Sequence, residues 1–588
     1  MDNRFFRKTR SNKEIAPPYR SRGILRHACR SAIEPLEGRL LFSTYTVTNL
    51  ADSGIGSLRY EIAQANAHAG ADTIAFASGL HGRITLTSGQ IEISDTSGTT
   101  SIQGPGAATI GVSGNNASRV IQVDAKVAAS ISGLSLFYGK APTAVVAGGF
   151  AGGGIILSLG SVQLLNDQLT SSHATATSTM VGGALFLYDA SSTPASSITN
   201  CIITGNSATA YGGAIFNFGG TLNTSGNNFS SNVVTMGAGG AIGAGINGPG
   251  VSAIVNVTSS SFSGNQALDV SNFNVAQGGA IASLTSGTLS VTKSTFTKNY
   301  AAGYGGAIWG QGGMTVSGTT FQANGSGEGG NAIRNDSGSG LVTSSTFTGN
   351  LGGVAGGAIL SSGHIAVVNS MFTLNVADNN GGAIENDNTG SITGCTFSNN
   401  SVSINPGDSG GAVNNESGLA IYDSTFVANT ANQGGAVSNE GNITIDDCTI
   451  TGNTAVKLQS QGAGGGLYSA VNAKAALNNS IVSGNVHTVY MNSSVAPVAD
   501  DISGSAPGGA NLIGAGGSGG LANGVNGNIV GAINPLLAPL ANNGGPTETA
   551  ALLAGSPAAG AGSKALLPSG LTTDQRGLPR VVNGSLDI

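Results

Sequence analysis

Acidic residues recur beside asparagines along this chain, and an arginine stands near them. The pairs are Asn335–Asp336, Asn386–Asp387, Asn415–Glu416 and Asn439–Glu440, with Arg334 and Glu385 adjacent to two of them. Clustered carboxylates bind calcium or act as general acids and bases, often with a basic residue beside them. The catalytic candidates are therefore Arg334, Asp336, Glu385, Asp387, Glu416 and Glu440. Asp387, Glu416 and Glu440 are also calcium candidates, and no other cofactor is expected.

Whether these acids meet depends on the elements that carry them, and the composition indicates a repeat. The 588 residues include 95 glycines, and only 9% are charged. Residues 1–40 hold ten of the 23 Lys and Arg and four of the 29 acids, which leaves 13 basic and 25 acidic residues, a net of −12. Because residues 41–588 carry so few cationic side chains, we do not expect them to bind nucleic acid. No stretch reaches the roughly 18 apolar residues of a membrane-spanning helix.

Two short motifs alternate through the chain. Gly-Gly-Ala followed by Ile, Leu or Val begins at Gly182, Gly212, Gly239, Gly278, Gly305, Gly356, Gly381, Gly410 and Gly434, with looser copies at Gly329 and Gly464. Between the copies falls Phe-x-x-Asn, from Phe229/Asn232 to Phe426/Asn429. The units hold short alternating runs and no helical period, which predicts an all-β, parallel β-helix with Phe and Ile columns inside and Gly and Asn at corners. The right-handed form is expected from the usual hand of parallel crossovers.

In such a stack Asp387, Glu416 and Glu440 would lie in a row, about 5 Å apart. One interpretation is a calcium site or a carbohydrate-binding strip. The other, which we favour, is an Asn ladder at the corner with a solvated acid beside it. The acidic pair Asp446–Asp447 lies on a strand, and we expect it to be surface charge.

The sequence GDSGG around Ser409 could mark a serine nucleophile. Such a serine needs a histidine base and a carboxylate, and none of the six histidines stands in a protease-like setting. Gly410 and Gly411 are the glycines of the repeat itself. We therefore expect Ser409 to be a turn residue.

Three of the four cysteines occupy one position of the repeat. Cys201, Cys395 and Cys448 each lie two residues before the Phe or Ile column, where other units have Ser or Thr. Two units separate Cys395 from Cys448, which is too far for a disulfide. We expect free, buried thiols.

The paired motifs resemble the repeats of chlamydial polymorphic outer-membrane proteins, which are surface adhesins with a β-helical passenger. The resemblance covers about residues 181–485. "IEPLEGRLLFS" (33–43) resembles the LEPR-XLL motif of exported bacterial proteins, and residues 45–74 resemble an N-terminal β-helix cap. There Ser57 would begin a short helix, about 57–68, whose Leu58, Ile62 and Ala65 cover the first coil. The segment from Asn534 onward resembles the choice-of-anchor Q segment, which precedes a cell-envelope anchor.

These features divide the chain into four parts. Residues 1–43 are expected to be a basic targeting or disordered segment, 44–80 the N-terminal cap, 81–500 the β-helix and 501–588 a C-terminal cap or anchor-type segment. We expect residues 501–588 to cover the edge of the last coil, because an open edge invites aggregation.

The function expected is that of an exported cell-surface protein, adhesive or structural in the envelope and non-enzymatic. Its partners would be extracellular polysaccharides or other surface proteins. The alternative is a polysaccharide lyase or glycoside hydrolase, because pectate lyases and related enzymes share the pectin lyase-like β-helix. Aromatic residues near two repeats could form a sugar platform, although core or corner packing is the interpretation we favour; they are Tyr211, Phe216, Phe218, Tyr304 and Trp309.

Overall fold

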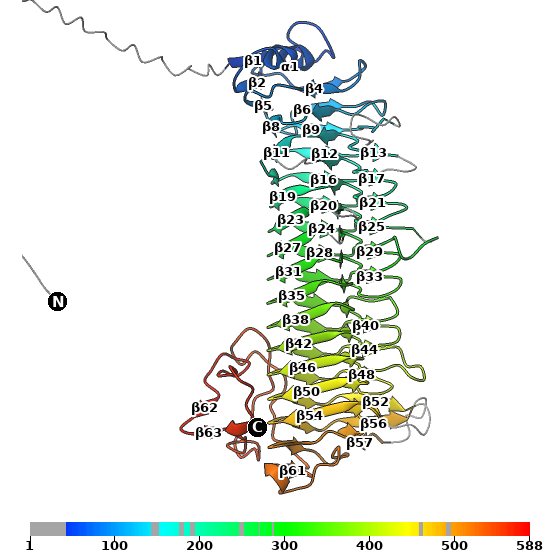
Figure 1. The fold of residues 1–588 in the computed structure, drawn as a ribbon, viewed down its shortest axis with the longest axis vertical. Coiled ribbons are helices and arrows are strands. Elements are labelled where there is room, and N and C mark those ends of the chain that lie inside the picture. The colour runs from blue at the N-terminus through cyan, green and yellow to red at the C-terminus, as the bar shows by residue number, and fades with distance from the viewer. Residues whose placement is uncertain are drawn as a thin grey trace, which may run out of the picture. The chain divides into compact units, whose positions relative to one another are not determined.

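The computed structural model describes residues 43–588, apart from 143–151, 176–180, 189–193, 246–251, 270, 285–286, 458–462 and 490–495. Residues 1–42, with Cys29 and the LEPR-XLL-like motif, therefore lie outside the described residues. Within the described part, short strands wind into a parallel β-solenoid of stacked coils (Figure 1). None of the helices described there is long and apolar enough to cross a bilayer.

Three long parallel sheets run along the described part of the solenoid, and most coils contribute one strand to each of them. The described strands of sheet 1 are β1 (Ser43–Val47), β2 (Asp72–Phe76), β5 (Thr99–Gln103), β8 (Ala128–Ser132), β11 (Ser161–Leu165), β15 (Ser196–Thr199), β19 (Gly220–Ser225), β23 (Ala253–Thr258), β27 (Thr288–Thr292), β31 (Gly313–Ser317), β35 (Ser339–Thr343), β38 (His364–Val368), β42 (Thr389–Thr393), β46 (Gly418–Tyr422), β50 (Asn442–Asp446), β54 (Lys474–Asn478) and β59 (Gly508–Gly509).

The described strands of sheet 2, most of them three residues long, are β4 (Ile91–Ile93), β7 (Ile121–Val123), β10 (Ile156–Ser158), β14 (Leu185–Leu187), β18 (Ile215–Asn217), β22 (Ile242–Ala244), β26 (Ile281–Ser283), β30 (Ile308–Gly310), β34 (Ile333–Asn335), β37 (Ile359–Ser361), β41 (Ile384–Asn386), β45 (Val413–Asn415), β49 (Val437–Asn439), β53 (Leu467–Ser469) and β58 (Ile502–Ser503).

Sheet 3 carries the phenylalanine column. Its strands are β3 (Gly82–Thr85), β6 (Ile110–Ser113), β9 (Ser135–Phe137), β12 (Gln168–Thr170), β16 (Ile202–Thr204), β20 (Asn228–Ser230), β24 (Ser261–Ser263), β28 (Thr295–Thr297), β32 (Thr320–Gln322), β36 (Thr346–Thr348), β39 (Met371–Thr373), β43 (Thr396–Ser398), β47 (Thr425–Val427), β51 (Thr449–Thr451), β55 (Ile481–Ser483), β60 (Leu512–Ile513) and β61 (Ile529–Val530).

Shorter strands follow sheet 3 in many coils. They are β13 (His173–Ala174), β17 (Ser207–Ala208), β21 (Val233–Val234), β25 (Gln266–Ala267), β29 (Tyr300–Ala301), β33 (Gly325–Ser326), β40 (Val376–Ala377), β44 (Ser401–Val402), β48 (Thr430–Ala431), β52 (Thr454–Lys457), β56 (Val486–Val489) and β57 (Val498–Ala499). The remaining elements are the helix α1 (Leu58–Asn66), the 3-10 turns η1 (Val525–Gly527) and η2 (Lys564–Leu566), and the hairpin β62 (Val581–Val582) and β63 (Ser585–Leu586).

The predicted phenylalanine column lies inside the solenoid. Eight rings, from Phe229 to Phe426, stack with centroids 4.6 to 5.0 Å apart and planes within 12° of parallel. All are fully buried. The ring spacing matches the distance between hydrogen-bonded strands, so the backbone ladder itself sets the stack.

The asparagine of Phe-x-x-Asn forms a second ladder. Asn350, for example, donates from Nδ2 to the Phe321 carbonyl at 3.2 Å and to Asn375 Oδ1 at 2.9 Å, and its Oδ1 accepts from the Asn324 amide at 3.0 Å. The ladder ends at Asp501, whose Oδ1 accepts from Asn485. The backbone at this buried corner would otherwise leave polar groups unpaired, and the repeated asparagine side chain supplies their hydrogen-bond partners.

The cysteines lie where the repeat predicts. Cys201, Cys395 and Cys448 are free and buried, and the Cys395 backbone amide donates to Ser424 Oγ of the next coil. Burial raises the pKa of the Cys201 and Cys395 thiols to about 12. The column therefore needs a small side chain with an acceptor atom, which Ser, Thr and Cys all supply.

The two positions of the glycine doublet require glycine for different reasons, as Gly410 and Gly411 illustrate. Gly410 has φ +68°, and a Cβ there would lie 2.4 Å from the Val413 carbonyl oxygen. A Cβ on Gly411 would lie 2.1 Å from the Gly435 carbonyl oxygen of the next coil. The first glycine thus provides a left-handed turn, and the second allows two coils to approach closely.

The N-terminal helix α1 lies at the first coils (Figure 1). The Ser57 hydroxyl accepts a hydrogen bond from the Tyr60 amide, which starts the helix as predicted. Leu58, Ile62 and Ala65 are buried and belong to the main hydrophobic core.

The C-terminal segment packs against the side of the stack. Strands β58 to β61 still continue the coils, whereas residues 534–588 hydrogen-bond to coils between Gly394 and Asn479. Gln575 inserts its amide between Thr425 Oγ1, at 2.7 Å, and the Cys395 carbonyl, at 3.1 Å. The expected cover over the edge of the last coil stays a prediction, since these contacts are lateral.

This segment corrects the expectation that Asp446–Asp447 is surface charge. Both residues are buried. Asp447 lies 3.1 Å from the Arg580 guanidinium, which also pairs with Asp423, and Asp446 accepts a hydrogen bond from Asn478. Asp447 therefore pairs with a distant, non-repeating part of the chain, whereas Asp446 is paired within the stack, with Asn478 of the next coil.

Candidate functional site

The candidate residues lie on and beside the outer face of sheet 2. The middle residue of each strand points away from the solenoid interior, and register aligns Trp309, Arg334, Leu360, Glu385, Asn414 and Ser438 in one column. Most of this column is nevertheless buried. The residues before each glycine doublet form a second row of parallel bridges that contacts it.

Phe216 and Trp309 belong to this covered column. Tyr211 and Tyr304 belong to the row of bridges beside it, and Phe218 follows strand β18. Phe216, Phe218 and Trp309 are buried, and Tyr211 stacks on Phe216 with centroids 5.6 Å apart. Trp309 packs with Leu284 in a separate apolar cluster. Corner packing, the alternative favoured from the sequence, accounts for them.

Arg334 opens the polar part of the column. Its guanidinium lies 3.1 Å from Asp336 Oδ1, donates to Ser362 Oγ at 2.9 Å and lies 5.1 Å above the Tyr304 ring. Its Nη1 approaches Asp387 Oδ2 at 4.0 Å. Arg334 therefore has partners on four successive coils, and its side chain is only 12% exposed.

The corner acids form the predicted row, with one interruption. The Glu416 amide donates to the Asn386 carbonyl, and the Glu440 amide to the Asn415 carbonyl, so Asp387, Glu416 and Glu440 lie on successive coils. One coil separates Asp336 from Asp387, and its corner residue is Ser362, whose Oγ donates to Asp387 Oδ2 at 2.5 Å. The structure therefore brings the candidates into one strip.

The asparagines beside these acids form the predicted corner ladder. Asn386 Nδ2 donates to Asn415 Oδ1 at 2.9 Å, and Asn415 Nδ2 donates to Asn439 Oδ1 at 2.8 Å. All three are fully buried. The structural interpretation of the asparagines thus holds, while Asp387, Glu416 and Glu440 remain exposed next to them.

Glu385 differs from every other acid in the strip because it is only 2% exposed. Its Oε1 accepts a hydrogen bond from Asn414 Nδ2 at 2.9 Å, and its Oε2 is buried with no hydrogen-bond donor among the residues that the structure describes. One carboxylate oxygen from each of Glu385, Asp387 and Glu416 lies within 4.8 Å of the others. Burial raises the pKa of Glu385 well above its usual range, and the charges of Asp387, Glu416 and Glu440 add to this.

Burial also raises the pKa of Glu416, with contributions from Asp387 and Glu440. Both shifts have the same physical origin, since negative charges gather where water is partly excluded. The strip can therefore bind a cation, or hold a proton between carboxyl groups.

Sequence reasoning identified the exposed acids but did not assign roles to Ser362 and Asn414. Glu385 stands between two inward residues, so its outward direction could have been predicted from the period of two. The burial of Glu385 could not have been predicted, because the residues that cover the column belong to a separate row, the row of bridges before the glycine doublets.

Ser409 is not the turn residue that was predicted, because it lies in the row of parallel bridges before the glycine doublets, where it pairs with Asn380 and Gln433. It is fully buried, and its Oγ lies 3.2 Å from Asn380 Oδ1 and 3.2 Å from Asn414 Oδ1. The hydroxyl can donate to either of these amide oxygens, one in the covering row and one in sheet 2.

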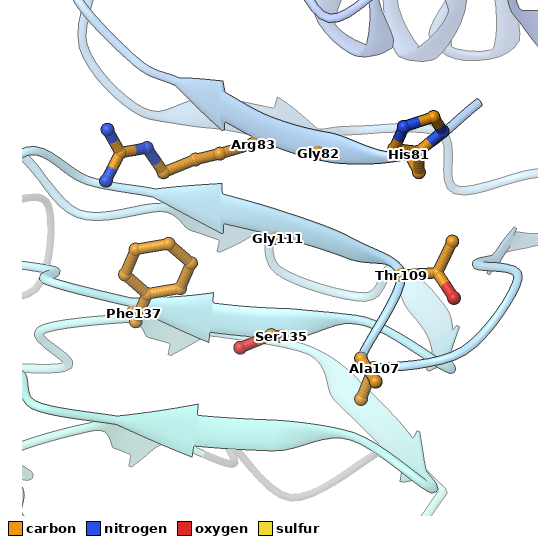
Figure 2. Close-up of a pocket in the computed structure, with 9 residues that line it drawn as sticks. His81, Gly82, Arg83, Ala107, Thr109, Gly111, Ser135 and Phe137 are labelled. Atoms are coloured by element: carbon orange, nitrogen blue, oxygen red, sulfur yellow. The ribbon is translucent and has the colours of Figure 1, made fainter.

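A separate shallow hollow lies on the outer face of the first strands of sheet 3 (Figure 2). Arg83 and Phe137 lie at one end and His81 at the other, with Gly82 and Gly111 between them. A Cβ on Gly111 would lie 2.7 Å from the Phe137 ring, so a larger residue there would crowd the hollow.

A comparison with known families finds a match within the solenoid. Residues 293–311 match the Chlamydia polymorphic membrane protein repeat, and this segment contains Phe296, Asn299 and the glycine doublet at Gly305. No curated protein matches the chain. The chain is a parallel β-solenoid repeat protein, and one of its coils is similar to a polymorphic membrane protein repeat.

Proposed function

We propose that this protein is an exported cell-surface β-helix protein that acts in adhesion or envelope structure and is not an enzyme. The matched repeat is named for membrane proteins of Chlamydia, and the repeated ladders give a stiff support for exposed side chains. A solenoid suits this role because each added coil extends the exposed surface and is stabilised by the same contacts with its neighbours.

The observation that carries the proposal is an apolar edge on the turns that follow sheet 3. It consists of exposed Tyr300, Leu351, Val354 and Leu374. The amides of Tyr300 and Leu351 donate to equivalent asparagine carbonyls, those of Asn265 and Asn324, so the two residues share one column along the stack. Exposed apolar side chains aligned in this way favour contact with another surface.

Two experiments test the proposal. A membrane-impermeant amine reagent applied to intact source cells should label the exposed Lys293 and Lys298; labelling only after lysis would contradict surface exposure. A deletion strain carrying Tyr300→Ser with Leu351→Ser should attach to alkyl-coated glass less than one carrying the wild type or Lys474→Ser, an exposed control on sheet 1. Equal attachment would refute the adhesive role of this edge.

For a polysaccharide partner, the hollow in Figure 2 provides complementary chemistry. Arg83 can pair with a uronic acid carboxylate, and the Phe137 ring can stack on a sugar face. Binding of acidic polysaccharide should fall in Arg83→Ala and stay unchanged in Lys474→Ser.

A polysaccharide lyase or hydrolase is the second candidate, because Arg334 stands 4.0 Å from one of three clustered carboxylates. Turnover of acidic polysaccharides in the presence of calcium, lost in both Asp387→Ala and Glu416→Ala, would establish this function instead. We favour the non-enzymatic role because the Arg334 guanidinium is already engaged by Asp336 and Ser362.

The remaining features fit export and attachment. We infer a right-handed, pectin lyase-like solenoid in which α1 covers the first coil. The LEPR-XLL-like motif and the choice-of-anchor Q-like segment would direct the protein to the cell envelope.

A further inference from the structure

One buried carboxylate oxygen of Glu385 has no hydrogen-bond donor in the described part of the chain. Glu385 is only 2% exposed, its Oε1 accepts a hydrogen bond from Asn414, and its Oε2 has no partner among the described residues. A buried carboxylate oxygen without a partner costs free energy. It requires either a proton or a cation, and its surroundings decide between them.

Two further carboxylates converge on the same point. One oxygen each of Glu385, Asp387 and Glu416 lies within 4.8 Å of the others. Three oxygens around a calcium ion at about 2.4 Å, with the ion in their plane, lie about 4.2 Å apart. The cluster therefore reaches calcium distances with small side-chain movements. Magnesium, at about 2.1 Å, demands a closer approach and near-octahedral geometry.

The positive charge nearby does not neutralise the cluster. Arg334 is 3.1 Å from Asp336 but 4.0 Å from Asp387, so its single charge is shared by two acids. Glu440 on the next coil adds a further negative charge. A single proton would satisfy one oxygen and leave the neighbouring carboxylates charged, whereas a divalent cation contacts all three.

The frame of the cluster is already rigid. Asn414 orients Glu385, and Ser362 orients Asp387, both through hydrogen bonds from neighbouring coils. Glu385 and Asp387 lie on one coil and Glu416 on the next, so the stack fixes the spacing. Water would supply the remaining ligands, as in other calcium sites.

We propose that Glu385, Asp387 and Glu416 form a calcium site on the outer face of sheet 2. Glu385, and not Glu440, supplies the third protein carboxylate. The bound ion would join two successive coils, so calcium would stabilise the solenoid locally. The proposal does not depend on the surface role of the protein.

The test is calorimetric titration of the full chain, treated with EDTA and dialysed, with calcium chloride and separately with magnesium chloride. We expect saturable calcium binding with a Kd below about 1 mM and binding of magnesium at least about tenfold weaker. Glu385→Gln should weaken calcium binding at least about tenfold, while the corner control Glu440→Gln should weaken it less than about threefold. The glutamine retains the hydrogen bond to Asn414 as an acceptor and can donate to Glu416.

A second measurement distinguishes the loss of calcium binding from misfolding of the variant. Amide hydrogen exchange of β41 and β45 should slow with calcium in the wild type and in Glu440→Gln, but not in Glu385→Gln. Circular dichroism should be the same for all three proteins in EDTA. Calcium binding to Glu385→Gln as tight as to the wild type, or no saturable binding by the wild type, would overturn the proposal.

Discussion

The phenylalanine column allows a direct test of what stabilises the solenoid. Phe347 stacks between Phe321 and Phe372, at 4.8 and 4.7 Å, whereas Phe426 stacks on Phe397 at 4.7 Å and faces Ile450 on its other side. Both rings are fully buried. The same substitution, Phe→Ile, therefore removes two ring pairs at position 347 and one at position 426.

The magnitude follows from this difference. Replacing Phe by Ile shortens a packed core side chain, and the resulting transfer and cavity cost applies to both sites alike. Each stacked aromatic pair contributes about 0.5–1.5 kcal/mol beyond burial. Phe347→Ile should therefore be destabilised by about 1 kcal/mol more than Phe426→Ile. Isoleucine already occupies this column at Ile203 and Ile450, so both variants should fold.

The assay must report local stability, because long repeat arrays do not unfold in a single two-state step. Amide hydrogen exchange of β36, which carries Phe347, and of β47, which carries Phe426, measures local opening. A difference of 1 kcal/mol corresponds to roughly fivefold in the opening equilibrium. Equal changes in the two strands, or a larger change in β47, would refute the claim that ring stacking adds to burial.

Three further predictions follow from other contacts. Asn350→Ala removes four side-chain hydrogen bonds, two donated and two accepted, and should cost about 4 kcal/mol in local stability, measured by exchange of the flanking strands. Burial raises the pKa of Asp423 to about 6 and of Asp447 to about 7. Release of residues 534–588 would return the pKa of both acids toward 3.8. Between about pH 4 and 7 the docked state therefore binds more protons than the released state. Docking should weaken as the pH rises through this range, by at most about 1.4 kcal/mol per pH unit for each of the two acids. Exchange of β62 and β63, corrected for intrinsic rates, should therefore be faster at pH 8 than at pH 5, and Asp447→Asn should reduce the difference. The buried thiols should resist iodoacetamide in the native protein and react after denaturation, as mass spectrometry can show for Cys201, Cys395 and Cys448.

Inward positions could be predicted from the sequence because the stack makes them repeat. A phenylalanine that must lie under another phenylalanine recurs at the same point of each unit, and so do Asn350 and its counterparts. Cys395 could be assigned to a buried column in the same way, since serine fills that position in neighbouring coils. The physical reason is that parallel coils bring equivalent atoms to one spacing along the whole solenoid.

Lateral contacts could not be predicted in this way. Asp447 looked like surface charge because its unit gives no sign of Arg580, which approaches from the C-terminal segment. Glu385 gave no signal of burial, because the residues that cover its column vary from coil to coil. The Arg580 contact occurs once, and the covering row repeats in position but not in residue type, so no periodicity of the sequence reports either of them.

The outward column of sheet 2 shows why the site lies where it does. Inward columns must pack against the same neighbours in every coil, so their residues stay alike, whereas this outward column is free to change. It runs from Phe216 through Trp309 to Arg334, and then to Glu385 and Asn414. The first part forms apolar clusters and the second a polar strip. Because the same backbone supports both parts, the change from apolar to polar must come from the side chains alone. An aromatic ring could occupy the position of Glu385, as it does in other coils. A buried carboxylate at this position therefore requires a ligand or a proton to offset the cost of its burial.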